Sequence, residues 1–129
     1  KVSNYMSENL VYDLLVKVLD ELSWKNLSVV CHYPLAKIIS DWSLLTSQEK
    51  DYAKNALTHI DFLIYNSLTK QPMMAIEVDG WHYHNDKVVQ QYRDRLKNQI
   101  LEKYSLPPYR ISTTDTITSE GLKEIFASL

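Results

Sequence analysis

HIDFLIYNSLTKQPMMAIEVDG, residues 59–80, holds two apolar runs joined by a short polar segment. The runs Ile60–Tyr65 and Met73–Asp79 are apolar at both odd and even positions, which is typical of strands covered on both faces. The connection from Asn66 to Pro72 is short enough for an antiparallel hairpin, and Gly80 ends the second run. This stretch therefore predicts the two central strands of a sheet.

The flanking sequence predicts further strands and helices around this hairpin. Short apolar runs predict strands at Leu27–Tyr33 and Tyr109–Ser112. Helices are expected at about Asn4–Leu22, Ser47–Leu57, Val88–Tyr104 and Ser119–Leu129, with a helical turn at Leu35–Ser40. The helix at 47–57 is polar and is expected to be exposed. The order α-β-(α)-β-β-α-β-α predicts one α/β domain over residues 1–129, with a mixed sheet of about four strands flanked by helices.

Apolar spacing assigns a core-facing stripe to each long helix. Residues three and four apart lie on one helix face. The first helix is expected to bury Met6, Leu10, Val11, Leu14, Leu15, Val18, Leu19 and Leu22. The later helix is expected to bury Val89, Tyr92, Leu96 and Ile100.

Composition limits the class of protein. With 129 residues and 45% apolar content, the chain suits one domain with a real core. It has no apolar run long enough to span a membrane. The lone Cys31 cannot form an internal disulfide, which favours a cytoplasmic location. The chain starts at Lys1 rather than Met, so we expect it to come from a longer protein. The net charge of −2 fits nucleic-acid binding only if the acids gather around a cation.

Three acids in the predicted strands indicate a metal site. Glu77 and Asp79 are two residues apart and project from one strand face, whereas Asp61 interrupts the preceding apolar run. Buried carboxylates are costly unless they are paired or bound to metal. Together they are expected to repel one another and to have raised pKa values. A divalent cation, Mg²⁺ or Mn²⁺, would remove that repulsion. The alternative is pairing with lysines or arginines on a solvated face.

Other polar residues are candidates for the same site. Glu8 shares a helix stripe with buried leucines, so it is either a dipole-favoured first-turn glutamate or a site residue. His82 and His84 follow Gly80 and suit proton transfer or phosphate contact, or else belong to a polar loop.

Cations on the later helix are candidates for contacts with phosphate. Arg93 lies on the apolar stripe, where its guanidinium needs an acceptor: a site carboxylate or a phosphate. Lys97 flanks it. Lys87 is either a contact to nucleic acid or an ordinary surface lysine.

Three segments carry a family resemblance: HIDFLIYN (59–66), AIEVDGWHYH (75–84) and YRDRLKNQILEKYSLPPYRIS (92–112). They resemble the PD-(D/E)XK restriction-endonuclease-like superfamily, in particular the branch similar to very-short-patch-repair endonucleases, some of which are attached to superfamily I helicases. The likeness spans about Val29–Ser112, and Glu8 matches an acid often found on the first helix. It implies a restriction-endonuclease-like core.

The resemblance also implies roles for individual residues. Asp61, Glu77 and the Val78 carbonyl would be metal ligands. The superfamily's usual lysine, two residues after the glutamate, is Asp79 here. His82 or His84 could then replace the lysine as general base, with Asp79 orienting it or holding a second metal.

These observations predict a Mg²⁺- or Mn²⁺-dependent DNA endonuclease domain, with Glu8, Asp61, Glu77, Asp79 and a histidine in catalysis. The alternative is a catalytically inactive nucleic-acid-binding module attached to a helicase or repair protein, which the missing lysine favours. A zinc-dependent deaminase or hydrolase would need ligands at spacings that the sequence lacks.

Overall fold

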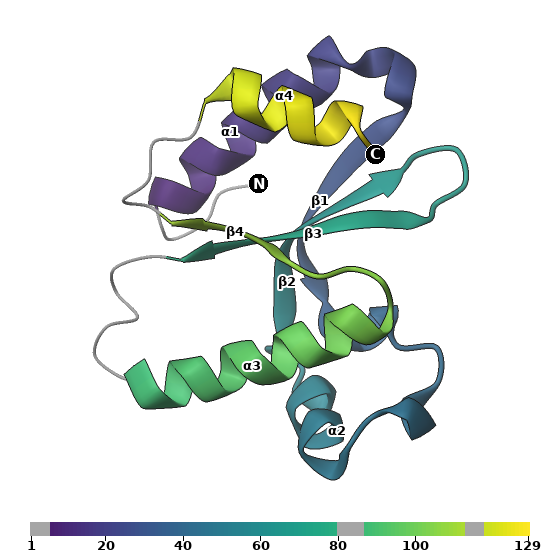
Figure 1. The fold of residues 1–129 in the computed structure, drawn as a ribbon, viewed down its shortest axis with the longest axis vertical. Helices are drawn as coiled ribbons and strands as arrows, with labels where there is room; N and C mark the ends of the chain where they lie inside the picture. Colours follow the sequence, from purple (N-terminus) through teal and green to yellow (C-terminus); the bar gives the residue numbers. More distant parts are fainter. Residues whose placement is uncertain (1–5, 80–86, 113–117) are drawn as a thin grey trace.

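The computed structural model describes residues 6–79, 87–112 and 118–129, and shows a four-stranded sheet with helices on both faces (Figure 1). The helices and strands, in chain order, are α1 (Met6–Glu21), β1 (Leu27–Pro34), α2 (Ser47–Lys54), β2 (His59–Asn66), β3 (Pro72–Asp79), α3 (Lys87–Lys103), β4 (Tyr109–Ser112) and α4 (Ser119–Ala127). Short 3₁₀ helices η1 (Ser23–Lys25), η2 (Leu35–Ile38) and η3 (Trp42–Leu44) complete them.

The sheet has the order β1-β2-β3-β4. β1 pairs with β2 and β2 with β3 in antiparallel fashion, whereas β4 runs parallel to β3. The antiparallel hairpin and the α/β class with a mixed four-stranded sheet are therefore confirmed. A parallel neighbour requires a crossover connection, and α3 supplies it between β3 and β4.

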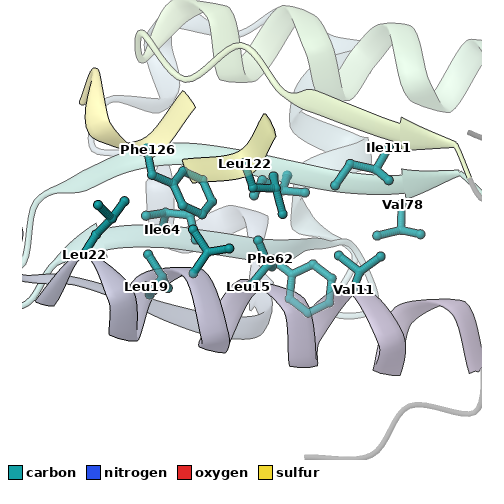
Figure 2. Close-up of a cluster of buried hydrophobic side chains, with 12 residues drawn as sticks. Val11, Leu15, Leu19, Leu22, Phe62, Ile64, Val78, Ile111, Leu122 and Phe126 are labelled. Carbon is teal, nitrogen blue, oxygen red and sulfur yellow. The ribbon is translucent and has the colours of Figure 1, made fainter. Parts of the chain in front are cut away.

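One face of the sheet packs against α1 and α4 (Figure 2). Aromatic and aliphatic side chains from α1, the strands and α4 interdigitate there, with Leu15 and Phe126 fully buried. Most of the predicted stripe of α1 contributes to this core, but the prediction for Leu10 is wrong, because its side chain is 63% exposed. Sixteen residues at 3.6 per turn give α1 a broad apolar arc, and only its centre meets the sheet.

The opposite face packs against η2, α2 and α3. The expectation that the whole 47–57 helix is exposed is wrong, since Glu49 and Ala53 of α2 are buried. Thr46 and Glu49 form a capping box at the start of this helix. On α3, Leu96 and Ile100 are buried as predicted, but Val89 and Tyr92 are 47% and 42% exposed. The core ends before it reaches the first turns of α3.

Strand alternation decides where the acids point. Phe62 and Val78 belong to the core under α1 and α4. Their neighbours Asp61 and Glu77 therefore project from the other face, toward α3. Within the described ranges, no helix is both long and apolar enough to cross a bilayer.

Candidate active site

The central feature of the site is a pair of carboxylates that bridge β2 and β3. The last ladder pair at this end of the hairpin is Phe62 with Ile76. Beyond it, the Asp61 N–H donates to Glu77 Oε2 at 2.8 Å, and the Val78 N–H donates to Asp61 Oδ2 at 2.8 Å. Each carboxylate thus takes the place of a backbone carbonyl of the facing strand. This exchange holds two acids side by side in a covered sheet.

A lysine from α3 lies against this pair. Lys97 Nζ donates to Glu77 Oε1 at 2.6 Å and to the His59 carbonyl at 2.7 Å. Its side chain is 11% exposed and that of Glu77 is 5% exposed. Burial raises the pKa of Glu77, and Lys97 offsets that only in part. Burial would lower the pKa of Lys97, but the charge and hydrogen bond of Glu77, together with the charges of Tyr52 and Asp61, outweigh this effect, so the pKa is raised. Lys97 therefore stays charged beside the glutamate.

His59 lies on the other side of Asp61. Its Nδ1 donates to the Leu57 carbonyl at 3.1 Å, and its Nε2 lies 3.4 Å from Asp61 Oδ1. The hydrogen bond to Asp61 raises the pKa of His59. Burial would raise the pKa of Asp61, but the bonds from His59 and from the Val78 N–H outweigh it, so the pKa is lowered. The expectation of raised pKa values holds for Glu77 and fails for Asp61, which has donors rather than only like charges around it.

A second histidine extends the network to α1. The His32 ring packs against the His59 ring at 4.7 Å between centroids, and His32 Nε2 bonds Glu8 Oε1 at 3.0 Å. His32 lies in β1 with φ of 49°, an uncommon conformation for a residue with a β-carbon. Glu8 is buried, as its place on the stripe predicts. The two rings link it to Asp61.

Asp79 has a partner of its own in the same pocket. Arg110 Nη1 on β4 donates to Asp79 Oδ1 at 3.0 Å and lies 3.7 Å from Asp94, while Nη2 donates to Asn98 at 2.8 Å. Burial raises the pKa of Asp79, and Arg110 partly offsets this. All three acids line one pocket: Asp61 and Glu77 bridge β2 and β3, and Asp79 is paired with Arg110.

These groups lie in a pocket of about 750 Å³ between α2, α3 and the ends of β2, β3 and β4. Its lining includes Tyr52 and Leu57 as well as the Asp61–Glu77 pair. Arg93 lines it too, but is exposed. The structure gives the role of pairing with a site carboxylate to Lys97, one turn further along α3. Lys87 is exposed at the start of α3.

His82 and His84 lie outside the described residues. His59 and Arg110 were not predicted as site residues. Alternation could have identified His59, because it lies two residues before Asp61 on the same strand. Arg110 gives no comparable signal: a lone arginine on a short strand is equally typical of a surface.

Asp61 and Glu77 offer hard carboxylate oxygens, the ligands that Mg²⁺ prefers. Across residues 6–79, 87–112 and 118–129, no three His, Cys, Asp or Glu side chains gather as a metal-binding group. Zinc sites need three or four such ligands. Mg²⁺ is commonly held by one or two carboxylates with water completing the shell, and Asp61 and Glu77 are such a pair.

A family model matches residues 4–129, almost the whole chain. It is that of DUF2726, described as a protein of unknown function. No curated protein matches the sequence, and no solved structure does. Any function must therefore be argued from the site.

Proposed function

The chain belongs to the DUF2726 family, and we propose that it is a Mg²⁺-dependent deoxyribonuclease that hydrolyses phosphodiester bonds. The observation that carries the proposal is the meeting of Asp61, Glu77 and Lys97, from three different elements, in one pocket. Two carboxylates and a lysine are the groups that the resemblance to PD-(D/E)XK nucleases implies. Here the lysine comes from α3, since position 79 holds an aspartate.

Each group has a role that its surroundings support. Asp61 and Glu77, with the Val78 carbonyl, would hold the ion. Mg²⁺ would polarise the scissile phosphate and acidify an attacking water. Lys97 offsets part of the cost of burying the Glu77 carboxylate and places a positive charge where the charge on phosphate would grow.

The neighbouring residues support this arrangement. His59 orients Asp61 through Nε2, and the Glu8–His32 pair holds the His59 ring from behind. Arg93 on the rim would attract the phosphate backbone. His82 or His84 remain proposed proton carriers, and Lys87 a proposed backbone contact.

Plasmid nicking tests the proposal. Wild-type protein should relax supercoiled DNA with Mg²⁺ or Mn²⁺ and not with chelator. Asp61→Ala and Glu77→Ala should each lose this activity, whereas Glu21→Ala, which removes an exposed ion pair with Lys123, should keep it. Wild-type protein that leaves plasmid, linear duplex and single-stranded DNA intact with both metals would contradict the proposal.

A second candidate is a non-catalytic DNA-binding module, attached to a cytoplasmic helicase or repair protein. It is favoured by one observation: all four oxygens of Asp61 and Glu77 already have protein partners, with Lys97 on one of them. In that case the ion pair is structural, DNA binds without being cut, and Arg93→Ala weakens binding.

A further inference from the structure

We propose that the pocket takes an unpaired nucleotide, so that the substrate is single-stranded DNA or a single-stranded flap. This inference rests on the proposed function and names its substrate class. It starts from the two walls of the pocket, which α2 and α3 form above the acids. α2 lies in the segment between β1 and β2 and contributes Gln48, Asp51 and Tyr52 to the lining.

The rim of the pocket is apolar and exposed. Leu57 is 84% exposed, Val89 47% and Tyr92 42%, and all three line the pocket. The apolar stripe of α3 thus continues past the end of the core and borders the site. An exposed apolar patch at the edge of a charged pocket is typical of a binding surface.

The charge of the pocket argues against binding that depends mainly on phosphates. Its described lining carries five acids, namely Asp51, Asp61, Glu77, Asp79 and Asp94, and three permanent cations, namely Arg93, Lys97 and Arg110. Lys97 and Arg110 are already paired with acids of the same pocket. Duplex binding depends largely on phosphate contacts with lysine and arginine. The pocket therefore offers few free cations to any phosphate backbone, and contacts to bases would have to supply more of the affinity.

The rim can instead contact a base. Bases stack on aromatic side chains when they are not paired, and this contact does not depend on sequence. Tyr92 carries the Arg95 guanidinium 5.4 Å from its ring centroid, an arrangement that restrains the ring. With Leu57 on the opposite wall, Tyr92 would enclose one base while its phosphate lies near Lys97. In a duplex these bases are stacked and paired, so the apolar rim would gain nothing.

Fluorescence anisotropy tests this with a labelled oligonucleotide of about 16 nucleotides, single-stranded and annealed as a blunt duplex. Binding is measured with Ca²⁺ and again with chelator. Wild-type protein should bind the single strand at least about tenfold more tightly, with a shallow salt dependence. Tyr92→Ala should weaken single-strand binding at least about fivefold. The matched control is Val88→Ser, on the same helix and 79% exposed but outside the pocket lining.

Equal or tighter binding of the duplex in both conditions would overturn the inference, as would Tyr92→Ala that binds like wild type. A protein that prefers single strands but cuts no DNA with Mg²⁺ would overturn the proposed function and leave this inference standing. A protein that cuts duplex DNA as fast as single strands would support the proposed function and overturn this inference.

Discussion

At the scale of single residues, Lys97 decides what the site can do. Without it, Glu77 would be a buried acid beside another acid, and burial already raises its pKa. The same helix carries a second lysine–glutamate pair, in which only the glutamate is buried, since Lys103 Nζ lies 2.6 Å from Glu49 Oε1. The two pairs share chemistry and helix, but only Lys97 and Glu77 line the pocket. Comparing the two lysines therefore tests whether Lys97 has the catalytic role that we propose or only a structural one.

Lys97→Met should destabilise the fold by about 3–5 kcal/mol, because it leaves Glu77 buried without its partner. Lys103→Met should cost less, since Lys103 is 33% exposed. Urea unfolding measures both. At a temperature where both variants are folded, DNA cleavage should be lost in Lys97→Met and retained in Lys103→Met. Equal cleavage by the two variants would show that Lys97 has only a structural role.

The acids of this site could be predicted from sequence, but their partners could not. Asp61 and Glu77 stand out because a carboxylate inside an apolar strand needs a reason. Lys97 was predicted as a phosphate contact beside Arg93. Lys97 and Arg93 lie near the same face of α3. Which of the two reaches Glu77 depends on how α3 packs against the sheet. The spacing of residues along the helix does not reveal this packing.

At the scale of elements, α2 turns a sheet face into a pocket, and its attachment to α3 keeps it there. Glu49 caps α2 by accepting the Thr46 N–H in the capping box, and it attaches α2 to α3 by pairing with Lys103. Burial would raise the pKa of Glu49, but these hydrogen bonds outweigh it, and its pKa lies below the ordinary 4.5. A carboxyl group whose pKa is lower in the folded state stabilises the fold at any pH above its pKa in the unfolded chain. This stabilisation is lost as the pH falls through the pKa of the folded state.

Glu49→Gln should therefore lower stability by about 1–3 kcal/mol at pH 7, where the wild-type side chain is charged. The difference from wild type should shrink as pH falls below 4.5 and Glu49 takes up its proton. Thermal melts of the two proteins between neutral and acidic pH measure this. Glu21→Gln, which removes an exposed pair, should change little at any pH. If Glu49→Gln stays less stable than wild type by the same amount at acidic pH, the charge of Glu49 contributes nothing to stability.

At the scale of the whole molecule, the order of elements could be read from sequence because each strand and helix has its own period. The hairpin and the mixed sheet were predicted and are confirmed, whereas the parallel pairing of β3 with β4 through α3 was not predicted. The ends of the apolar stripes were not predicted either. Val89 and Tyr92 lie on the same face of α3 as the buried residues, so the spacing of apolar residues predicts that they are buried. Both are exposed, because how far the sheet extends beneath that face depends on the packed structure.

The central claim is that Asp61 and Glu77 hold a divalent cation, and metal-dependent stability tests it most directly. A ligand that binds only the folded chain stabilises it. Millimolar Mg²⁺ or Mn²⁺, compared with chelator, should raise the melting temperature of wild type and of Glu49→Gln, whose change lies outside the pocket. The shift should vanish in Asp61→Asn and in Glu77→Gln. Metal that stabilises none of the four proteins, or all four equally, would contradict the account.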